Sequence, residues 1–174
     1  QSSCIEADPG HHVPGNASTS QTECGLGTYQ PSYNQSSCIE ADPGHHVPDN
    51  ASTSQTECGL GTYQPYYNQS SCIEADPGHH VPGNASTSQT ECGLGTYQPS
   101  YNQSSCIEAD PGHHVPVNAS TGALACSSGN YQPSPGQSYC IEADPGHYVD
   151  STAATSQAEC GLGTYQPDTT QSSC

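Results

Sequence analysis

The chain contains no lysine and no arginine, and its 17 acidic residues give it a formal net charge of −17 at pH 7. A protein without basic side chains has no means of neutralising the phosphates of a nucleic acid, so the composition argues against nucleic acid as a partner. Attraction to anionic lipid is excluded for the same reason. No apolar run reaches the length of a membrane span, and no signal peptide is recognisable.

Large apolar side chains are also scarce. Phenylalanine, tryptophan and methionine are absent, and hydrophobic residues make up only 30% of the 174 positions. We therefore expect no central core, and only one or two sizeable apolar groups in each short stretch, such as Val13, Leu26 and Tyr29. With 15 prolines and 18 glycines interrupting every stretch, helix is not expected anywhere.

The chain consists of five copies of one sequence repeat. Its 11 cysteines are separated by a longer and a shorter gap in strict alternation, as at Cys4, Cys24 and Cys38, which gives a period of 34. We divide the chain into repeats at 1–34, 35–68, 69–102, 103–136 and 137–174, the last of which includes the start of another copy. Because Q-S-S-C stands at both ends, we interpret the sequence as part of a longer array. Repetition of this kind predicts a solenoid, rod or array.

A shorter, 17-residue unit lies inside the repeat. A shift of 17 places Gly10 on Gly27 and His12 on Tyr29, whereas Cys24 falls on an alanine. Each of these 17-residue blocks contains residues that favour a turn, Asp8-Pro9-Gly10 in the first block. A segment that can form a short strand follows the turn. The predicted fold is therefore a small, disulfide-rich run of β-hairpin or irregular blocks. These would form an elongated rod in which each block contacts only its neighbours.

Regular cysteines in a polar repeat predict disulfides and an oxidising compartment, so we expect an extracellular, secreted or cell-surface protein. A loop of about 15 residues closed by a disulfide is worth about 3 kcal/mol in the chain-entropy account. The spacing alone leaves two pairings open, one across the shorter gap, as in Cys24 with Cys38, and one across the longer gap, as in Cys4 with Cys24.

The segment from Cys24 to Tyr29, C-G-L-G-T-Y, closes at Cys38 and resembles the one-disulfide module of tumour-necrosis-factor-receptor and ephrin-receptor-like cysteine-rich repeats. The resemblance implies pairing across the shorter gap and leaves Cys4 to a partner upstream. Two departures are Gly25, where that family often has proline, and Ala41, where it has a second cysteine. The implied bonds are Cys24–Cys38, Cys58–Cys72, Cys92–Cys106, Cys126–Cys140 and Cys160–Cys174.

Seven N-x-[ST] sequons predict N-linked glycan, about one for each 17-residue unit. They fall in polar turn regions and alternate between N-A-S and N-Q-S. The predicted acceptors are Asn16, Asn34, Asn50, Asn68, Asn84, Asn102 and Asn118.

Histidine pairs and acidic pairs raise the question of metal binding. His11 and His12 recur in each of the next three repeats, but neighbouring strand residues point to opposite faces, so we expect a packing or surface role and no defined metal site. Glu6 and Asp8 also recur, and we expect them to bind calcium only diffusely, with no cofactor. No distinct Ser-His-Asp arrangement stands out, so the chain is not expected to be an enzyme.

These observations favour an extracellular structural protein, a glycosylated rod or fibril that continues end to end or associates with itself. The alternative is a ligand-binding or adhesive stalk of a cell-surface receptor, recognising its partner through Tyr33, Tyr66, Tyr67 and Tyr101. A receptor repeat usually diverges to build one distinct site, and near-identical copies favour the structural role.

Overall fold

The structure is a computed structural model that describes residues 4–174, so the first three positions of the predicted repeat 1–34 lie outside the described part. The described chain is built from nine two-stranded antiparallel hairpins, with no helix among residues 4–174. This confirms the predicted class of small, disulfide-rich β-hairpin repeats. Among the same residues, no helix has the length and apolar character required to cross a membrane.

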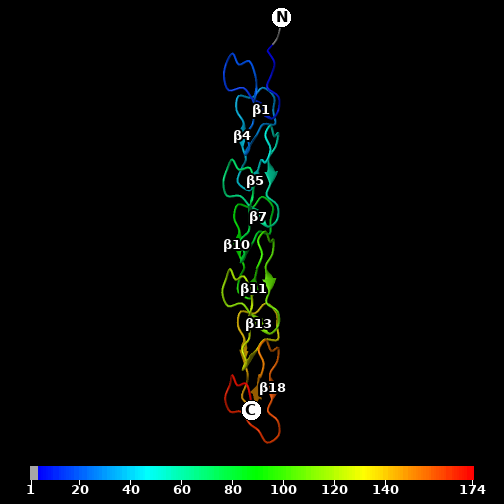
Figure 1. Cartoon of the computed structure of the whole chain (residues 1–174), viewed down its shortest axis with the longest axis vertical. Helices are drawn as coiled ribbons and strands as arrows, with labels where there is room; N and C mark the ends of the chain where they lie inside the picture. The colour runs from blue at the N-terminus through cyan, green and yellow to red at the C-terminus, as the bar shows by residue number, and fades with distance from the viewer. Residues whose placement is uncertain (1–3) are drawn as a thin grey trace. The chain divides into compact units, whose positions relative to one another are not determined.

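The hairpins fall into two compact units. The first comprises the described part of Gln1–Ala75 together with Val81–Gln89, and the second comprises Asp76–His80 and Thr90–Cys174. Within each unit, successive hairpins follow one another in chain order (Figure 1). The first unit contains β1 (His11–His12), β2 (Thr22–Glu23), β3 (Thr28–Tyr29), β4 (Ile39–Glu40), β5 (His45–His46), β6 (Thr56–Glu57), β7 (Thr62–Tyr63) and β8 (Ile73–Glu74). The second contains β9 (His79–His80), β10 (Thr90–Glu91), β11 (Thr96–Tyr97), β12 (Ile107–Glu108), β13 (His113–His114), β14 (Leu124–Ala125), β15 (Asn130–Tyr131), β16 (Ile141–Glu142), β17 (His147–Tyr148) and β18 (Ala158–Glu159).

Five of the nine hairpins begin at the predicted Asp-Pro-Gly turn, and the other four begin at a turn such as Gly25–Thr28. The amide of His11 donates to the carbonyl oxygen of Asp8 at 3.0 Å, and Gly10 between them has a φ of 80°. A type II turn requires positive φ at its third position, which glycine adopts readily, and proline is common at its second position. The strand that follows pairs His11 with Glu23 and His12 with Thr22.

A repeating set of backbone hydrogen bonds joins one 17-residue block to the next within each unit. Gly10 donates its amide hydrogen to the carbonyl of Gln30 at 2.7 Å, and Gly27 donates to that of Val47 at 2.9 Å. The carbonyl of Gly10 in turn accepts a hydrogen bond from the amide of Cys24 at 2.8 Å. We call this set the interblock frame.

The buried positions form two rows of small or polar groups. One row alternates alanine and cysteine from block to block, beginning with Ala7, Cys24 and Ala41. The other alternates glutamine and valine in the same way, beginning with Gln30 and Val47. Leu26, one of the few sizeable apolar residues of the chain, lies outside these rows and is 56% exposed.

The buried glutamines are fully hydrogen-bonded. Gln30 donates through Nε2 to the carbonyl of Ser37 at 2.8 Å, and its Oε1 accepts from the amide of Ser32 at 3.0 Å. A buried amide with these partners avoids the cost of an unsatisfied polar group, so glutamine can replace valine in the row.

Contacts also extend beyond adjacent blocks, contrary to the expectation that each block meets only its neighbours. A Cβ added to Gly44 would collide with the backbone carbonyl of Ala85, and Gly10 stands in the same relation to Ala51. Ala51 and Ala85 themselves have positive φ, 54° and 52°. Each glycine therefore allows a close approach between two backbone segments that lie more than two blocks apart in the sequence.

We predict that Gly44→Ala destabilises the first unit by on the order of 1–3 kcal/mol, because the added methyl meets Ala85 and because alanine disfavours the φ of 81°. Gly59→Ala is the matched control, since a Cβ at Gly59 meets nothing within 4 Å. Thermal unfolding followed by circular dichroism would measure both variants. Equal unfolding temperatures for the two would contradict the close approach.

Candidate functional site

The candidate functional sites of the repeats are the disulfides and the side chains that contact them. In the structure, the cysteines on either side of each shorter gap are bonded, with Cα–Cα distances of 5.7 Å for Cys24–Cys38 and 5.8 Å for Cys126–Cys140. These are the pairs that the resemblance implied, and the alternative pairing across the longer gap is not formed. The other three bonds are Cys58–Cys72, Cys92–Cys106 and Cys160–Cys174. Cys4 is an exposed free cysteine.

Each of the four disulfides from Cys24–Cys38 to Cys126–Cys140 joins two successive hairpins. Cys24 directly follows β2 and is fully buried, whereas Cys38 directly precedes β4 and is half-buried. The bond therefore links the end of one hairpin to the second strand of the next, close to the interblock frame.

The blocks without cysteines have a polar clamp in nearly the same place. Gln55 donates through Nε2 to Oδ2 of Asp42 at 2.9 Å, and the amide of Asp42 donates to Oε1 of Gln55 at 2.8 Å. A shift of one 17-residue block places Ala41 on Cys58 and Gln55 on Cys72. The same pair of hydrogen bonds joins Asp8 with Gln21 and Asp144 with Gln157. Alternate blocks are thus tied by a covalent bond or by this Asp–Gln clamp.

The fourth repeat lacks the clamp glutamine. Asp110 stands where Asp42 does, but the position of Gln55 is taken by Ala123. Its hairpin β13–β14 is still formed, with His113 opposite Ala125. The clamp therefore adds stability without being required for the hairpin.

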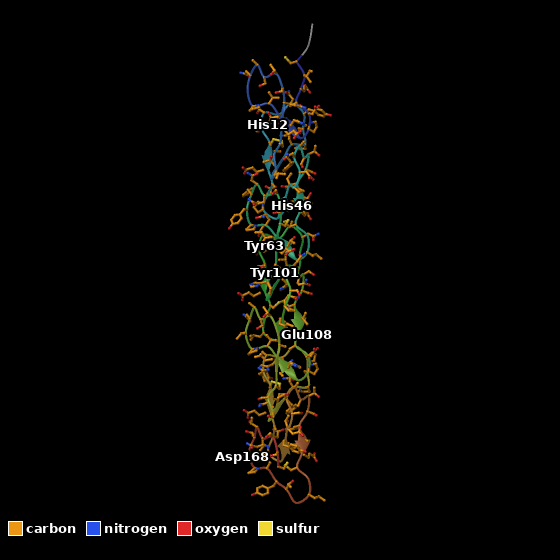
Figure 2. The ribbon with its side chains drawn as sticks, viewed as in Figure 1. His12, His46, Tyr63, Tyr101, Glu108 and Asp168 are labelled. Atoms are coloured by element: carbon orange, nitrogen blue, oxygen red, sulfur yellow. A yellow bond between two sulfur atoms is a disulfide. The ribbon has the colours of Figure 1, made fainter. Side chains whose placement is uncertain are left out.

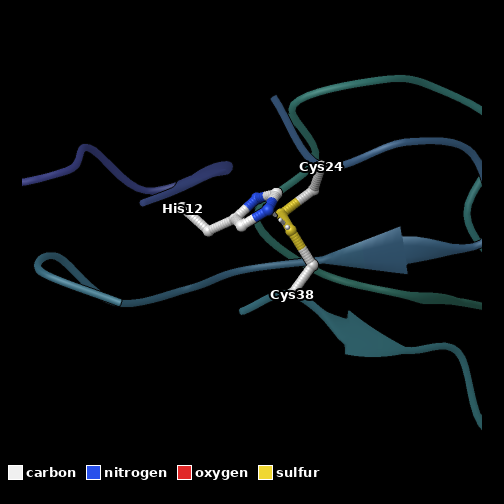
Figure 3. Close-up of side chains that lie close together, drawn as sticks. All are labelled: His12, Cys24 and Cys38. Atoms are coloured by element: carbon white, nitrogen blue, oxygen red, sulfur yellow. Dashed lines mark hydrogen bonds between the residues drawn. A yellow bond between two sulfur atoms is a disulfide. The ribbon is translucent and has the colours of Figure 1, made fainter. Parts of the chain in front are cut away.

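The second histidine of each pair lies against a disulfide. Nδ1 of His12 is 3.2 Å from Sγ of Cys38, which belongs to the following hairpin (Figure 3). His46 has the same contact with Cys72 in the first unit, at 3.2 Å (His12 and His46 are labelled in Figure 2). His80 and His114 repeat it in the second unit, at 3.2 and 3.1 Å.

The first histidine of each pair has a different environment. Nδ1 of His11 lies 3.2 Å from the carbonyl oxygen of Pro9, within its own turn. The two histidines of a pair therefore make different contacts. Sequence reasoning weighed the histidines only against each other, and so missed the cysteines that the hairpin brings to His12.

The second histidine and the second cysteine of each of the first four repeats therefore converge with the first cysteine of the repeat that follows. Their potential ligand atoms lie within 4.8 Å of one another, and we call each set a His–Cys–Cys cluster. In the fifth repeat the histidine is replaced by Tyr148. The clusters are His12, Cys24 and Cys38; His46, Cys58 and Cys72; His80, Cys92 and Cys106; and His114, Cys126 and Cys140.

All seven sequon asparagines are exposed or half-buried at the surface of their turns. Those of the N-Q-S type have positive φ, as at Asn34 and Asn68 with 59°, and Oδ1 of Asn68 lies beside Gly27. In the N-A-S type it is the following alanine, such as Ala17 with φ of 56°, that has this conformation. The acceptors accordingly belong to two different local structures, and their glycosylation stays a prediction.

Exposed tyrosines recur on the same repeat. Tyr33 and Tyr67 are 61% and 60% exposed, and Tyr101, labelled in Figure 2, is 59% exposed. Tyr66 has a 65% exposed side chain beside Tyr67. The structure thus leaves all four tyrosines of the alternative binding hypothesis accessible to solvent.

Comparisons with known proteins add no family assignment. No protein-family description matches the chain, and no curated protein sequence matches it either.

We predict that Gln55→Ala lowers the stability of the first unit by about 0.5–1.5 kcal/mol, because two hydrogen bonds to Asp42 are lost from a partly exposed site. Opening the Cys58–Cys72 disulfide with a Cys58→Ala/Cys72→Gln double substitution should cost more, about 3 kcal/mol. Denaturant unfolding of both variants would test this order. A larger loss from Gln55→Ala than from the double substitution would contradict it.

Proposed function

We propose that this chain is a segment of an extracellular structural protein in which the repeats extend into a glycosylated rod or fibril. The observation that carries the proposal is the interblock frame. Each 17-residue block uses the same backbone donors and acceptors toward the next block, as Gly27 does toward Val47 and Gly44 toward Gln64. A frame of this kind sets no limit on the number of blocks, so length grows with copy number.

Composition and disulfides support the location. Five disulfides suggest an oxidising environment, in keeping with an extracellular or secreted protein. A net charge of −17 without any basic residue keeps like chains apart unless cations screen them. Diffuse calcium along Glu6, Asp8 and their counterparts would supply such screening. We propose no catalytic role, no cofactor and no nucleic-acid partner.

The relation to tumour-necrosis-factor-receptor and ephrin-receptor-like modules remains part of this proposal. It is supported by the Cys24–Cys38 disulfide and by the strand at Thr28–Tyr29 that follows the Gly25–Thr28 turn. A receptor stalk is the second candidate function, favoured by the exposed Tyr33, Tyr67 and Tyr101. Replacing these three tyrosines with serine would abolish adhesion in a stalk of that type and leave a purely mechanical rod unaffected.

We predict that the radius of gyration increases in proportion to copy number in segments of two, three and five repeats, measured by small-angle X-ray scattering. A compact domain of 174 residues would have a radius of gyration of roughly 16 Å. The radius of gyration of the five-repeat segment should lie well above that value, because a rod is several times longer than it is wide. A radius near the compact figure at all lengths would refute the rod.

We further predict that Asn16 and the other sequon asparagines carry glycan, since they lie in turns that solvent reaches. Intact mass before and after treatment with an N-glycosidase would measure occupancy on material purified from its native source. Chemical deglycosylation serves as the control for sugars that the enzyme does not release. A native mass equal to that of the bare polypeptide would remove the glycan from the proposal.

A further inference from the structure

The His–Cys–Cys clusters have the donor set of a thiophilic metal site. A histidine nitrogen and two cysteine sulfurs are typical ligands of Zn²⁺, with bonds of about 2.0–2.1 Å to nitrogen and about 2.3 Å to sulfur. Tetrahedral bonds of these lengths place ligand atoms roughly 3.5–3.8 Å apart. The His12 Nδ1 to Cys38 Sγ distance is 3.2 Å, and all three donors lie within 4.8 Å of one another.

We propose that the reduced chain binds one Zn²⁺ ion at each of the four His–Cys–Cys clusters, and that the disulfide and the metal are alternative occupants of the same place. The two cysteines would bind as thiolates and the histidine through Nδ1. Because Cys38 and His12 are half-buried, solvent reaches the cluster, and we assign the fourth coordination position to water.

The backbone position of Cys24 is fixed by hydrogen bonds as well as by the disulfide. The amide of Cys24 donates to Gly10 at 2.8 Å, and the carbonyl of Cys24 accepts from Ala51 at 2.8 Å. The alternate blocks form the same frame without a disulfide: Ala41 donates to Gly27 at 2.8 Å and accepts from Asn68 at 2.9 Å. Since these blocks keep the frame with alanine, the reduced cysteine blocks are expected to keep it too. The Cα–Cα distance of 5.7 Å then leaves both sulfurs free to rotate toward one ion.

Exchange of the disulfide for a bound Zn²⁺ ion requires reduction of the disulfide. Reduction adds two electrons and two protons to the disulfide and yields two thiols, and binding of Zn²⁺ then displaces those two protons. In the reverse direction, the two thiolates pass two electrons to the disulfide of an oxidising dithiol–disulfide protein. That disulfide takes up two protons to become a dithiol, the chain's own disulfide forms, and Zn²⁺ is released. Metal loading before oxidation would keep each cysteine beside its correct partner.

The fifth repeat supplies an internal control. Cys160 and Cys174 are bonded like the other pairs, but Tyr148 stands where the other repeats have histidine. Tyrosine is therefore compatible with this hairpin, and exchanging histidine and tyrosine at the position tests the metal site without disturbing the fold.

The test uses the full chain with Cys4→Ala, reduced by a phosphine under anaerobic conditions and titrated with Co²⁺, whose thiolate complexes absorb light. We expect four Co²⁺ ions per chain, displaced by four Zn²⁺ ions. His114→Tyr should lower the number to three, and Tyr148→His should raise it to five. The oxidised chain should bind none at the clusters.

Two results would overturn the proposal. One is a stoichiometry that His114→Tyr and Tyr148→His leave unchanged, because thiols alone would then account for binding. The other is a zinc-loaded reduced chain whose far-ultraviolet circular dichroism differs from that of the oxidised chain, because binding to an unfolded chain does not use the clusters. Matching spectra together with the expected shifts in stoichiometry would support it.

Discussion

The structure depends on backbone hydrogen bonds between blocks, because the chain has too few large apolar side chains to hold itself together otherwise. Such bonds require close backbones, and at the closest approaches only small groups fit between them. This accounts for the buried alanine–cysteine row and for glycines such as Gly44, which lies against Ala85. Burial here serves mainly to shield the hydrogen bonds from water, with little apolar area contributed by each block.

Two kinds of tie reinforce this frame, and they respond differently to the environment. The disulfide of Cys58–Cys72 depends on redox conditions, whereas the clamp of Asp42 and Gln55 depends on hydrogen bonding alone. Where the two alternate along the chain, the clamped blocks stay tied when the disulfides are reduced. In a partly reduced chain, clamped blocks therefore stay folded beside the open cysteine pairs that they flank, which favours reformation of the same pairs.

The sequence predicts the local features of this fold well. The Asp8-Pro9-Gly10 turn, the strands that follow it and the absence of helix among the described residues all depend on neighbouring residues. The second strand of each hairpin, such as Thr22–Glu23, has no local signal, because its partner strand and its interblock contacts lie far from it in the sequence. The same separation hid the contact of His12 with Cys38. Hydrophobicity alone also does not identify the buried positions, because Leu26 is 56% exposed whereas the buried rows consist of alanine, cysteine, glutamine and valine.

The fourth repeat shows which residues the hairpin requires, because its exposed residues differ from those of the third repeat. It replaces Thr90 and Glu91 of the third repeat by Leu124 and Ala125, both exposed, yet it keeps buried Cys126 and forms the same hairpin. The frame thus tolerates different exposed residues. The near-identity of the first three repeats, including their exposed tyrosines, is therefore not demanded by the fold. A surface repeated at a fixed interval suits a partner that is itself repetitive, such as a neighbouring chain of the same kind, better than a single compact ligand.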